Sequence, residues 1–238
     1  MARLPRLTLL DHMHWVVWRG NNGQSVFLDA QDRLFFLELM VQATRDLRVD
    51  WHGYVLLDHE VWLLLTPRQD QALSACMQAV GRRYVRRFNS RHGRSGTLWE
   101  GRFRCTVLDP RAHALEALSC FDWEPVRAGL VHAPEAYAWS SHLHYLGRRL
   151  DSALVAPAAY WDLGNTPFAR EEAYGRYVQV GVSAGVRHRL LEAALKGWPV
   201  GDSAFLAGLQ EMTSRRVVKA KVGRPPKPQT FNMSPIKD

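Results

Sequence analysis

Residues 51–66 read WHGYVLLDHEVWLLLT and contain two apolar runs, Trp51–Leu57 and Val61–Thr66. The polar triplet Asp58-His59-Glu60 separates them. Runs of this length that are rich in β-branched and aromatic residues indicate strands, and the short polar break indicates a tight hairpin. We therefore expect an antiparallel strand pair in the fold.

The segments around this hairpin predict two more strands and three helices. Hydrophobic periodicity and turn residues give, in chain order, a strand at His14–Arg19, a helix at Asp29–Leu47, the hairpin, a helix at Asp70–Arg91, a strand at Phe103–Leu108 and a helix from Asp109 to about Trp123. Glu124-Pro125 is expected to end the last helix. This order is that of a ferredoxin-like α+β fold, an antiparallel sheet with helices on one face. We expect the other face to be free for a ligand.

A change of composition after Gly147 predicts three parts. Residues 1–147 form the α+β domain, and residues 148–214 form a helical accessory region with a break at Gly197-Trp198-Pro199. Residues 215–238 contain four prolines and no apolar periodicity, so we expect a basic, disordered tail.

Positive charge is concentrated in two segments of a chain whose net charge is +8. Residues 82–104 contain eight arginines and one glutamate, and residues 215–238 contain seven lysines or arginines and one aspartate. Local cationic patches of this kind are typical of proteins that bind a phosphate backbone. Solvated basic faces without a partner are the alternative interpretation.

The rest of the composition points to a folded protein of the cytoplasm. No apolar run approaches the roughly 20 residues of a membrane helix, so we expect no membrane partner. Residues 1–10 lack the apolar core of a signal peptide. Three cysteines, an odd number within apolar patterns, argue against a disulfide framework and favour a reducing compartment.

Seven short segments, in order along nearly the whole chain, carry a family resemblance. They are WRGNN (18–22), YVLLDHEVWLLLTP (54–67), MQAVGRRYVRRFN (77–89), GTLWEGRF (96–103), EPVRAGLV (124–131), WSS (139–141) and GRPPK (223–227). In these segments the chain resembles the REP-associated tyrosine transposases, bacterial single-strand DNA nicking and joining proteins of the HUH class. The resemblance implies DNA transposition chemistry and a structured single strand, such as a palindromic hairpin, as ligand.

The same resemblance shows that the residues of the family's chemistry are replaced. The family uses a His-hydrophobic-His pair on a strand to bind a divalent metal, a helix tyrosine that attacks the phosphate, and an Asn or Gln one turn later that completes the metal shell. The matching residues, which we call the four motif positions, are Glu60, Trp62, Cys120 and Glu124. Because tryptophan has no ligand atom for a hard cation and a thiolate is a soft nucleophile, we expect DNA binding without nicking, and no cofactor.

Two alternatives remain open. The site could be rebuilt on carboxylates around Mg²⁺ or Mn²⁺, with Glu60 and Glu124 assisted by Glu116 and His113, which would make the protein an active transposase or single-strand endonuclease. A regulatory or scaffold protein that has also lost DNA binding is the third hypothesis.

Arginines and aromatics supply the candidate DNA-binding residues. The polar face of the helix at residues 70–91 carries Arg82, Arg83, Arg86 and Arg87, and the following segment adds Arg94, Trp99, Arg102 and Arg104. Trp99 and Phe103 suit base stacking, but they suit equally well an apolar anchor for the next strand. Tyr84 falls on the apolar stripe and is expected in the core. Arg224, within Gly223-Arg224-Pro225, resembles the centre of an AT-hook or belongs to a plain basic tail.

Overall fold

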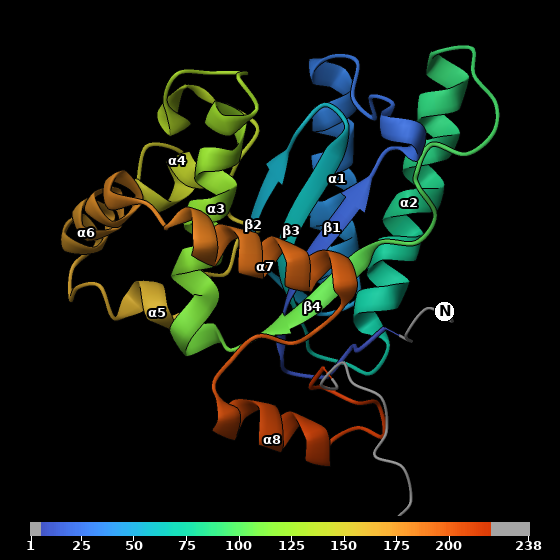
Figure 1. The fold of residues 1–238 in the computed structure, drawn as a ribbon. Coiled ribbons are helices and arrows are strands. Elements are labelled where there is room, and N and C mark those ends of the chain that lie inside the picture. The colour runs from blue at the N-terminus through green and yellow to red at the C-terminus, as the bar shows by residue number, and fades with distance from the viewer. Residues whose placement is uncertain (1–5, 220–238) are drawn as a thin grey trace, which may run out of the picture.

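One antiparallel sheet organises the computed structural model, which describes residues 6–219. Its strands are β1 (Met13–Arg19), β2 (Val49–Leu56), β3 (Glu60–Pro67) and β4 (Arg104–Leu108), hydrogen-bonded in the order β2-β3-β1-β4 (Figure 1). Every neighbouring pair is antiparallel. The predicted hairpin is β2–β3, and the order of strands and helices along the chain confirms the ferredoxin-like α+β fold.

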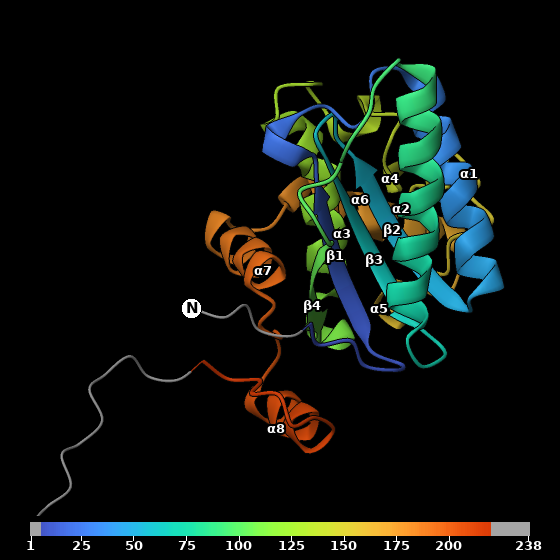
Figure 2. The same ribbon diagram turned by 90° about the vertical axis from the view of Figure 1, so that its right-hand side faces the viewer.

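Two long helices, α1 (Ala30–Asp46) and α2 (Ala72–Arg91), cover one face of the sheet (Figure 2). The N-terminus of α1 is capped by Asp29, whose side chain accepts a hydrogen bond from the Asp32 amide. The apolar stripe predicted for α2 is buried throughout and packs with sheet residues such as Trp18 and Leu63; its members are Leu73, Cys76, Met77, Val80, Tyr84 and Phe88. This packing turns the polar side of α2 to solvent.

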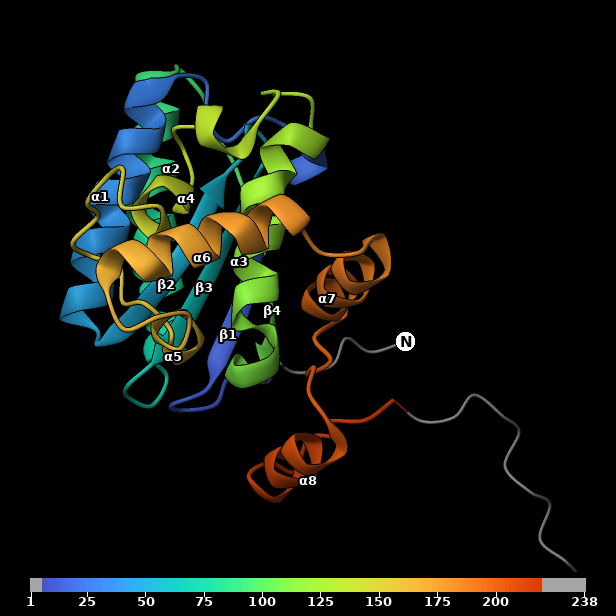
Figure 3. The same cartoon turned by 90° about the vertical axis from the view of Figure 1, so that its left-hand side faces the viewer.

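The other face of the sheet is also covered, so the expectation of a free face was wrong. The helices on this face are α3 (Pro110–Arg127), α6 (Pro167–Val180) and α7 (Ala184–Lys196); in Figure 3, α1 and α2 lie to the left of the strands, α3 and α6 pass in front of them, and α7 lies to their right. Trp15 and Trp62 project from the sheet into this second core, where both rings contact Phe121 of α3. Their burial excludes this face of the sheet as an open binding surface.

The remaining helices are short, with three to nine residues each. They are η1 (Asn21–Gly23), η2 (Pro134–Ala136), α4 (His142–Tyr145), α5 (Ala158–Trp161) and α8 (Ser203–Glu211). Helix α7 ends where Gly197 adopts a left-handed conformation with φ 74°, which matches the predicted break. Buried residues of α5, α6 and α7 belong to the same apolar cluster as those of α3.

Helix α3 continues through Pro125 to Arg127, although Glu124-Pro125 was expected to end it. A proline inside a helix removes one backbone hydrogen bond, but here only two residues follow it. The Pro125 carbonyl still accepts a bond from the Leu130 amide at 2.9 Å, which closes the helix end. Because the helix continues to Arg127, the side chains of Glu124 and Arg127 lie about one helical turn apart.

Residues 215–219 belong to the folded part, which corrects the expected start of the tail. Val217 is buried with Leu7, Val107 and Leu209 of α8. The Arg215 guanidinium donates to the Gly197 carbonyl. The rest of the predicted tail, including Arg224 and its AT-hook-like sequence, lies outside the described residues.

Candidate nucleic-acid interface

Helix α2 presents a row of arginines because its other side is apolar. Arg82, Arg83, Arg86 and Arg87 are all exposed, and residues 72–91 include no aspartate or glutamate. Arg83 donates to Gln42 at 2.7 Å, and the Arg87 guanidinium lies 4.4 Å from the ring centre of Phe35, so α1 orients these two side chains. The four predicted arginines therefore share one cationic surface.

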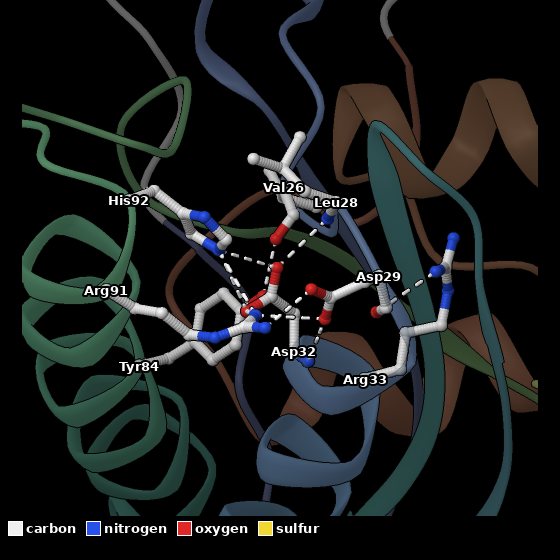
Figure 4. Close-up of polar contacts among 8 residues, drawn as sticks. All are labelled: Val26, Leu28, Asp29, Asp32, Arg33, Tyr84, Arg91 and His92. Atoms are coloured by element: carbon white, nitrogen blue, oxygen red, sulfur yellow. Dashed lines mark hydrogen bonds and ion pairs between the residues drawn. The ribbon is translucent and has the colours of Figure 1, made fainter.

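The end of α2 is fastened to the start of α1 by an ion-pair network (Figure 4). Arg91 donates to Asp32 at 2.7 Å and to Asp29 at 2.6 Å, and His92 contacts Asp32 at 3.0 Å. The hydrogen bond from Arg91 lowers the pKa of Asp29 to about 2. Tyr84 donates to the Val26 carbonyl in the core beneath, as its place on the apolar stripe predicted. These contacts fix the helix that carries the arginines.

The remaining predicted DNA contacts do not share one surface. Arg102 is exposed and lines a groove beside α2 together with Arg82 and Arg86. Arg94 is held by Gln24 and lies over Phe88. Arg104 projects from the opposite sheet face, where it donates to the Leu195 carbonyl of α7 at 3.3 Å. Arg104 is therefore separated from the α2 surface by the sheet.

Trp99 is 5% exposed and stacks on Trp18, with ring centres 4.2 Å apart. Phe103 is equally buried, and the Arg6 guanidinium covers its ring at 4.0 Å. Both aromatic residues therefore pack as apolar anchors in this structure. Because Trp99 is buried and one face of its ring stacks on Trp18, the ring is not an open platform in this structure.

The four motif positions lie between β3 and the overlying helices. Strand alternation places Glu60 and Trp62 on the face that meets α3. Glu60 is 6% exposed and accepts a hydrogen bond from Arg19 at 2.8 Å. Trp62 is fully buried, with its ring 5.2 Å from that of Trp15. An indole thus fills the core at the position that matches a metal-binding histidine.

Cys120 and Glu124 occupy successive turns of α3. Cys120 is fully buried, and this burial raises the pKa of its thiol to about 12. Glu124 accepts two hydrogen bonds from Arg187 of α7, at 2.6 and 2.9 Å, and lies 3.7 Å from Arg127. Burial and the neighbouring Arg187 lower the pKa of Arg127. Glu124 is thus a buried carboxylate that lies beside two guanidinium groups, those of Arg187 and Arg127.

This donor set does not fit a divalent metal. The two carboxylates at the motif positions each face a guanidinium, and Trp62 has no ligand atom. His113 and Glu116 pair with each other at 2.7 Å one turn earlier on α3. Within residues 6–219, His, Cys, Asp and Glu side chains do not gather in any group of three that could hold a metal ion.

Arg19 and Arg187 form ion pairs that the sequence did not predict. Arg19 was the last residue of a predicted strand, and Arg187 was one cation among several in a helical region. Their partners lie 41 and 63 residues away in the chain. A pairing over such a separation has no local sequence signal.

A comparison with solved structures identifies the fold. A REP-associated tyrosine transposase bound to a REP hairpin superimposes with a TM-score of 0.53 and 16% sequence identity, over 67% of this chain and 93% of that chain. This chain has the fold of a REP-associated tyrosine transposase. A crystal structure of a protein from Deinococcus radiodurans R1, assigned as a transposase, covers 48% of this chain and 91% of its own, with 17% identity and a TM-score of 0.36.

Comparisons at the level of sequence find no match. No protein-family model and no curated protein matches the chain. Among the described residues, no helix has both the length and the apolar character needed to cross a membrane.

Proposed function

We propose that this protein binds hairpin or single-stranded DNA through the arginine surface of α2 and does not nick it. The observation that carries the proposal is the set of four exposed arginines on a helix without acidic residues. Guanidinium groups bind phosphate oxygens through charge-assisted hydrogen bonds. The transposase of the same fold was solved with a REP hairpin, which supports a hairpin ligand here.

The environment of the motif positions supports binding without cleavage. Attack on a phosphodiester needs an accessible nucleophile, and thiolate formation at Cys120 is disfavoured by complete burial. A metal at Glu124 would have to displace Arg187, which holds both carboxylate oxygens. We place this activity in the cytoplasm of a bacterial cell.

A gel assay with an end-labelled palindromic hairpin tests binding and cleavage together. We expect a shifted band and no shortened product with Mg²⁺ or Mn²⁺. A shortened product that disappears in both Glu60→Gln and Glu124→Gln would instead establish the rebuilt carboxylate site. Absence of a shift at low salt would contradict DNA binding and favour a regulatory or scaffold role.

Two variants make the assay specific. Arg83→Gln removes a charge from the α2 surface and is expected to weaken the shift. Arg189→Gln removes the same charge from an exposed position on α7 and should leave the shift unchanged.

A further inference from the structure

A groove of about 570 Å³ lies where α1 ends and β2 begins. Its walls are the last turns of α1, the connection to β2 and the segment 152–155, which runs beside the edge of β2. None of the described residues that line it belongs to α2, so this groove is distinct from the arginine surface of α2. A volume of this size lies within the range of about 300–1,000 Å³ that is typical of small-molecule sites.

The groove exposes apolar surface on two of its walls. Val41 of α1 is 39% exposed, and Val155 of the segment 152–155 is 45% exposed. The buried Val49 and the half-buried Ala153 add to this apolar lining. Covering such surface with a ligand is favourable because it removes apolar area from water. The groove therefore suits a ligand with an apolar body.

Three arginines line the groove, and two of them are open to a ligand. Arg68 is paired with the lining residue Asp50 at 2.7 Å. The Arg45 side chain is 77% exposed, and Asp46, which lies 3.6 Å from it, is largely exposed as well. Among the described residues, the exposed Arg48 side chain has no hydrogen-bond or ion-pair partner. Guanidinium groups of this kind bind carboxylate and phosphate oxygens through charge-assisted hydrogen bonds.

The backbone of Arg48 adopts a conformation that costs free energy for an arginine. Its φ is 51°, in the left-handed region directly after Leu47, the C-cap of α1. Glycine is the usual residue at this place in a helix end, because a Cβ atom is disfavoured there. An arginine that is strained and also lacks a partner in the fold indicates a role for its side chain in binding.

We propose that this groove binds a small organic anion, a carboxylate or a phosphate monoester, whose charged group pairs with Arg48 and Arg45 and whose apolar body lies on the valines. The planar guanidinium matches both kinds of anion. The ligand is a free small molecule, so the inference goes beyond the proposed DNA binding and does not depend on it.

Four probes test the ligand chemistry in ligand-observed NMR titrations of the full chain. Phenyl phosphate and 3-phenylpropionate combine an anionic group with an apolar ring. Acetate lacks the apolar body, and 3-phenylpropionamide lacks the charge. We expect one of the two ring-bearing anions to bind at least tenfold more tightly than acetate and the amide. Tenfold corresponds to about 1.4 kcal/mol, no more than one charge-assisted hydrogen bond contributes. The tighter of the two anions identifies the ligand as a phosphate or a carboxylate.

Arg48→Gly separates binding from folding. The change removes the guanidinium and relieves the strained backbone, so binding of the preferred anion should weaken at least tenfold while the thermal midpoint does not fall. Arg45→Gln should also weaken binding. Arg111→Gln is the matched control, because it removes the same charge from an exposed position at the start of α3 and should leave binding unchanged.

The outcomes separate this site from the proposed function. Failure of both ring-bearing anions to bind, equal binding of acetate or the amide, or full binding by Arg48→Gly would overturn the site. Hairpin DNA at saturating concentration should not displace the anion, because α2 does not line the groove. Displacement would assign Arg45 and Arg48 to the DNA backbone and overturn a separate small-molecule site. Hairpin binding by the unmodified protein is measured independently, so each proposal can fail without the other.

Discussion

Arg187 and Glu124 form a two-point ion pair, in which the Nε and Nη2 groups of the arginine donate to the two carboxylate oxygens at 2.9 and 2.6 Å. The pair joins α7 to α3 at Glu124, the motif position that matches a metal ligand in the family that the chain resembles. The side chains are only 26% and 11% exposed. The Arg187 guanidinium therefore binds both oxygens of the Glu124 carboxylate.

Breaking this pair should destabilise the fold. Arg187→Met leaves Glu124 largely buried with a weaker cationic partner, so we expect a loss of about 2 kcal/mol in the free energy of unfolding. Urea unfolding of Arg187→Met, Glu124→Gln and the double variant gives the coupling energy, expected at about 1–3 kcal/mol. Arg189→Met, at an exposed position on the same helix, should change stability by less than about 0.5 kcal/mol. A coupling energy near zero would show that the pair has no energetic role.

Cys120 should be unreactive in the folded protein. All three cysteines are buried and unpaired, and burial raises the pKa of each thiol to about 12. A thiol reagent such as DTNB is therefore expected to label no cysteine rapidly under native conditions and all three in denaturant. Rapid native labelling that is lost in Cys120→Ser would reveal an accessible thiol and revive the possibility of a cysteine nucleophile.

Acidification should destabilise the protein through His14. This residue is fully buried in β1, its Nε2 accepts a hydrogen bond from the Leu9 amide, and burial lowers its pKa to about 4. Between pH 6.5 and 4 the His14 side chain binds a proton in the unfolded chain but stays neutral in the folded protein. The stability linked to His14 is therefore complete above pH 6.5 and falls by about 3 kcal/mol as the pH drops to 4.

Urea unfolding at pH 7 and pH 4.5 measures this linkage. His14→Gln should show a markedly smaller loss of stability on acidification than the unmodified protein. His59→Gln, at an exposed position, is the control and should behave as the unmodified protein does. Parallel losses in all three proteins would exclude His14 as the cause.

Residues 215–219 should contribute to the stability of the fold. Val217 is 2% exposed and Val218 is 55% exposed, so Val217→Ala should cost about 1–2 kcal/mol and Val218→Ala almost nothing. Removing residues 220–238 should leave the thermal midpoint within a degree or two and weaken DNA binding, because the removed segment carries a net positive charge. Removing residues 215–238 should lower the midpoint as well. Equal midpoints for both truncations would show that Val217 does not stabilise the fold.

The strands and the first two helices follow from local patterns. The stripe Leu73–Phe88 and the hairpin at residues 51–66 were predicted because their periodicity is set by neighbours in the chain. The covered second face was missed, although β3 gave a signal. Its sequence EVWLLLTP has little polar alternation, and apolar residues on both sides of a strand indicate a sheet buried on both faces.

The candidate site was only partly predictable for a related reason. The arginines of α2 follow from helical spacing, so their common surface could be predicted. Burial of Trp99 and the pairing of Glu124 with Arg187 depend on how distant segments pack, which local periodicity does not contain. The groove beside α2 likewise arises from the approach of residues 99–103 to α2.

The salt dependence of hairpin binding tests the central claim most directly. A variant in which Arg82, Arg83, Arg86 and Arg87 are all changed to glutamine should have a less steep plot of log K against log salt concentration. The magnitude of its slope should be smaller by about 3, since each lost phosphate contact contributes roughly 0.7–0.9. A second variant with Arg111, Arg148, Arg176 and Arg189 changed to glutamine removes the same charge from exposed positions outside α2. Our account predicts an unchanged slope for this control, whereas equal slopes for both variants would contradict DNA binding through α2.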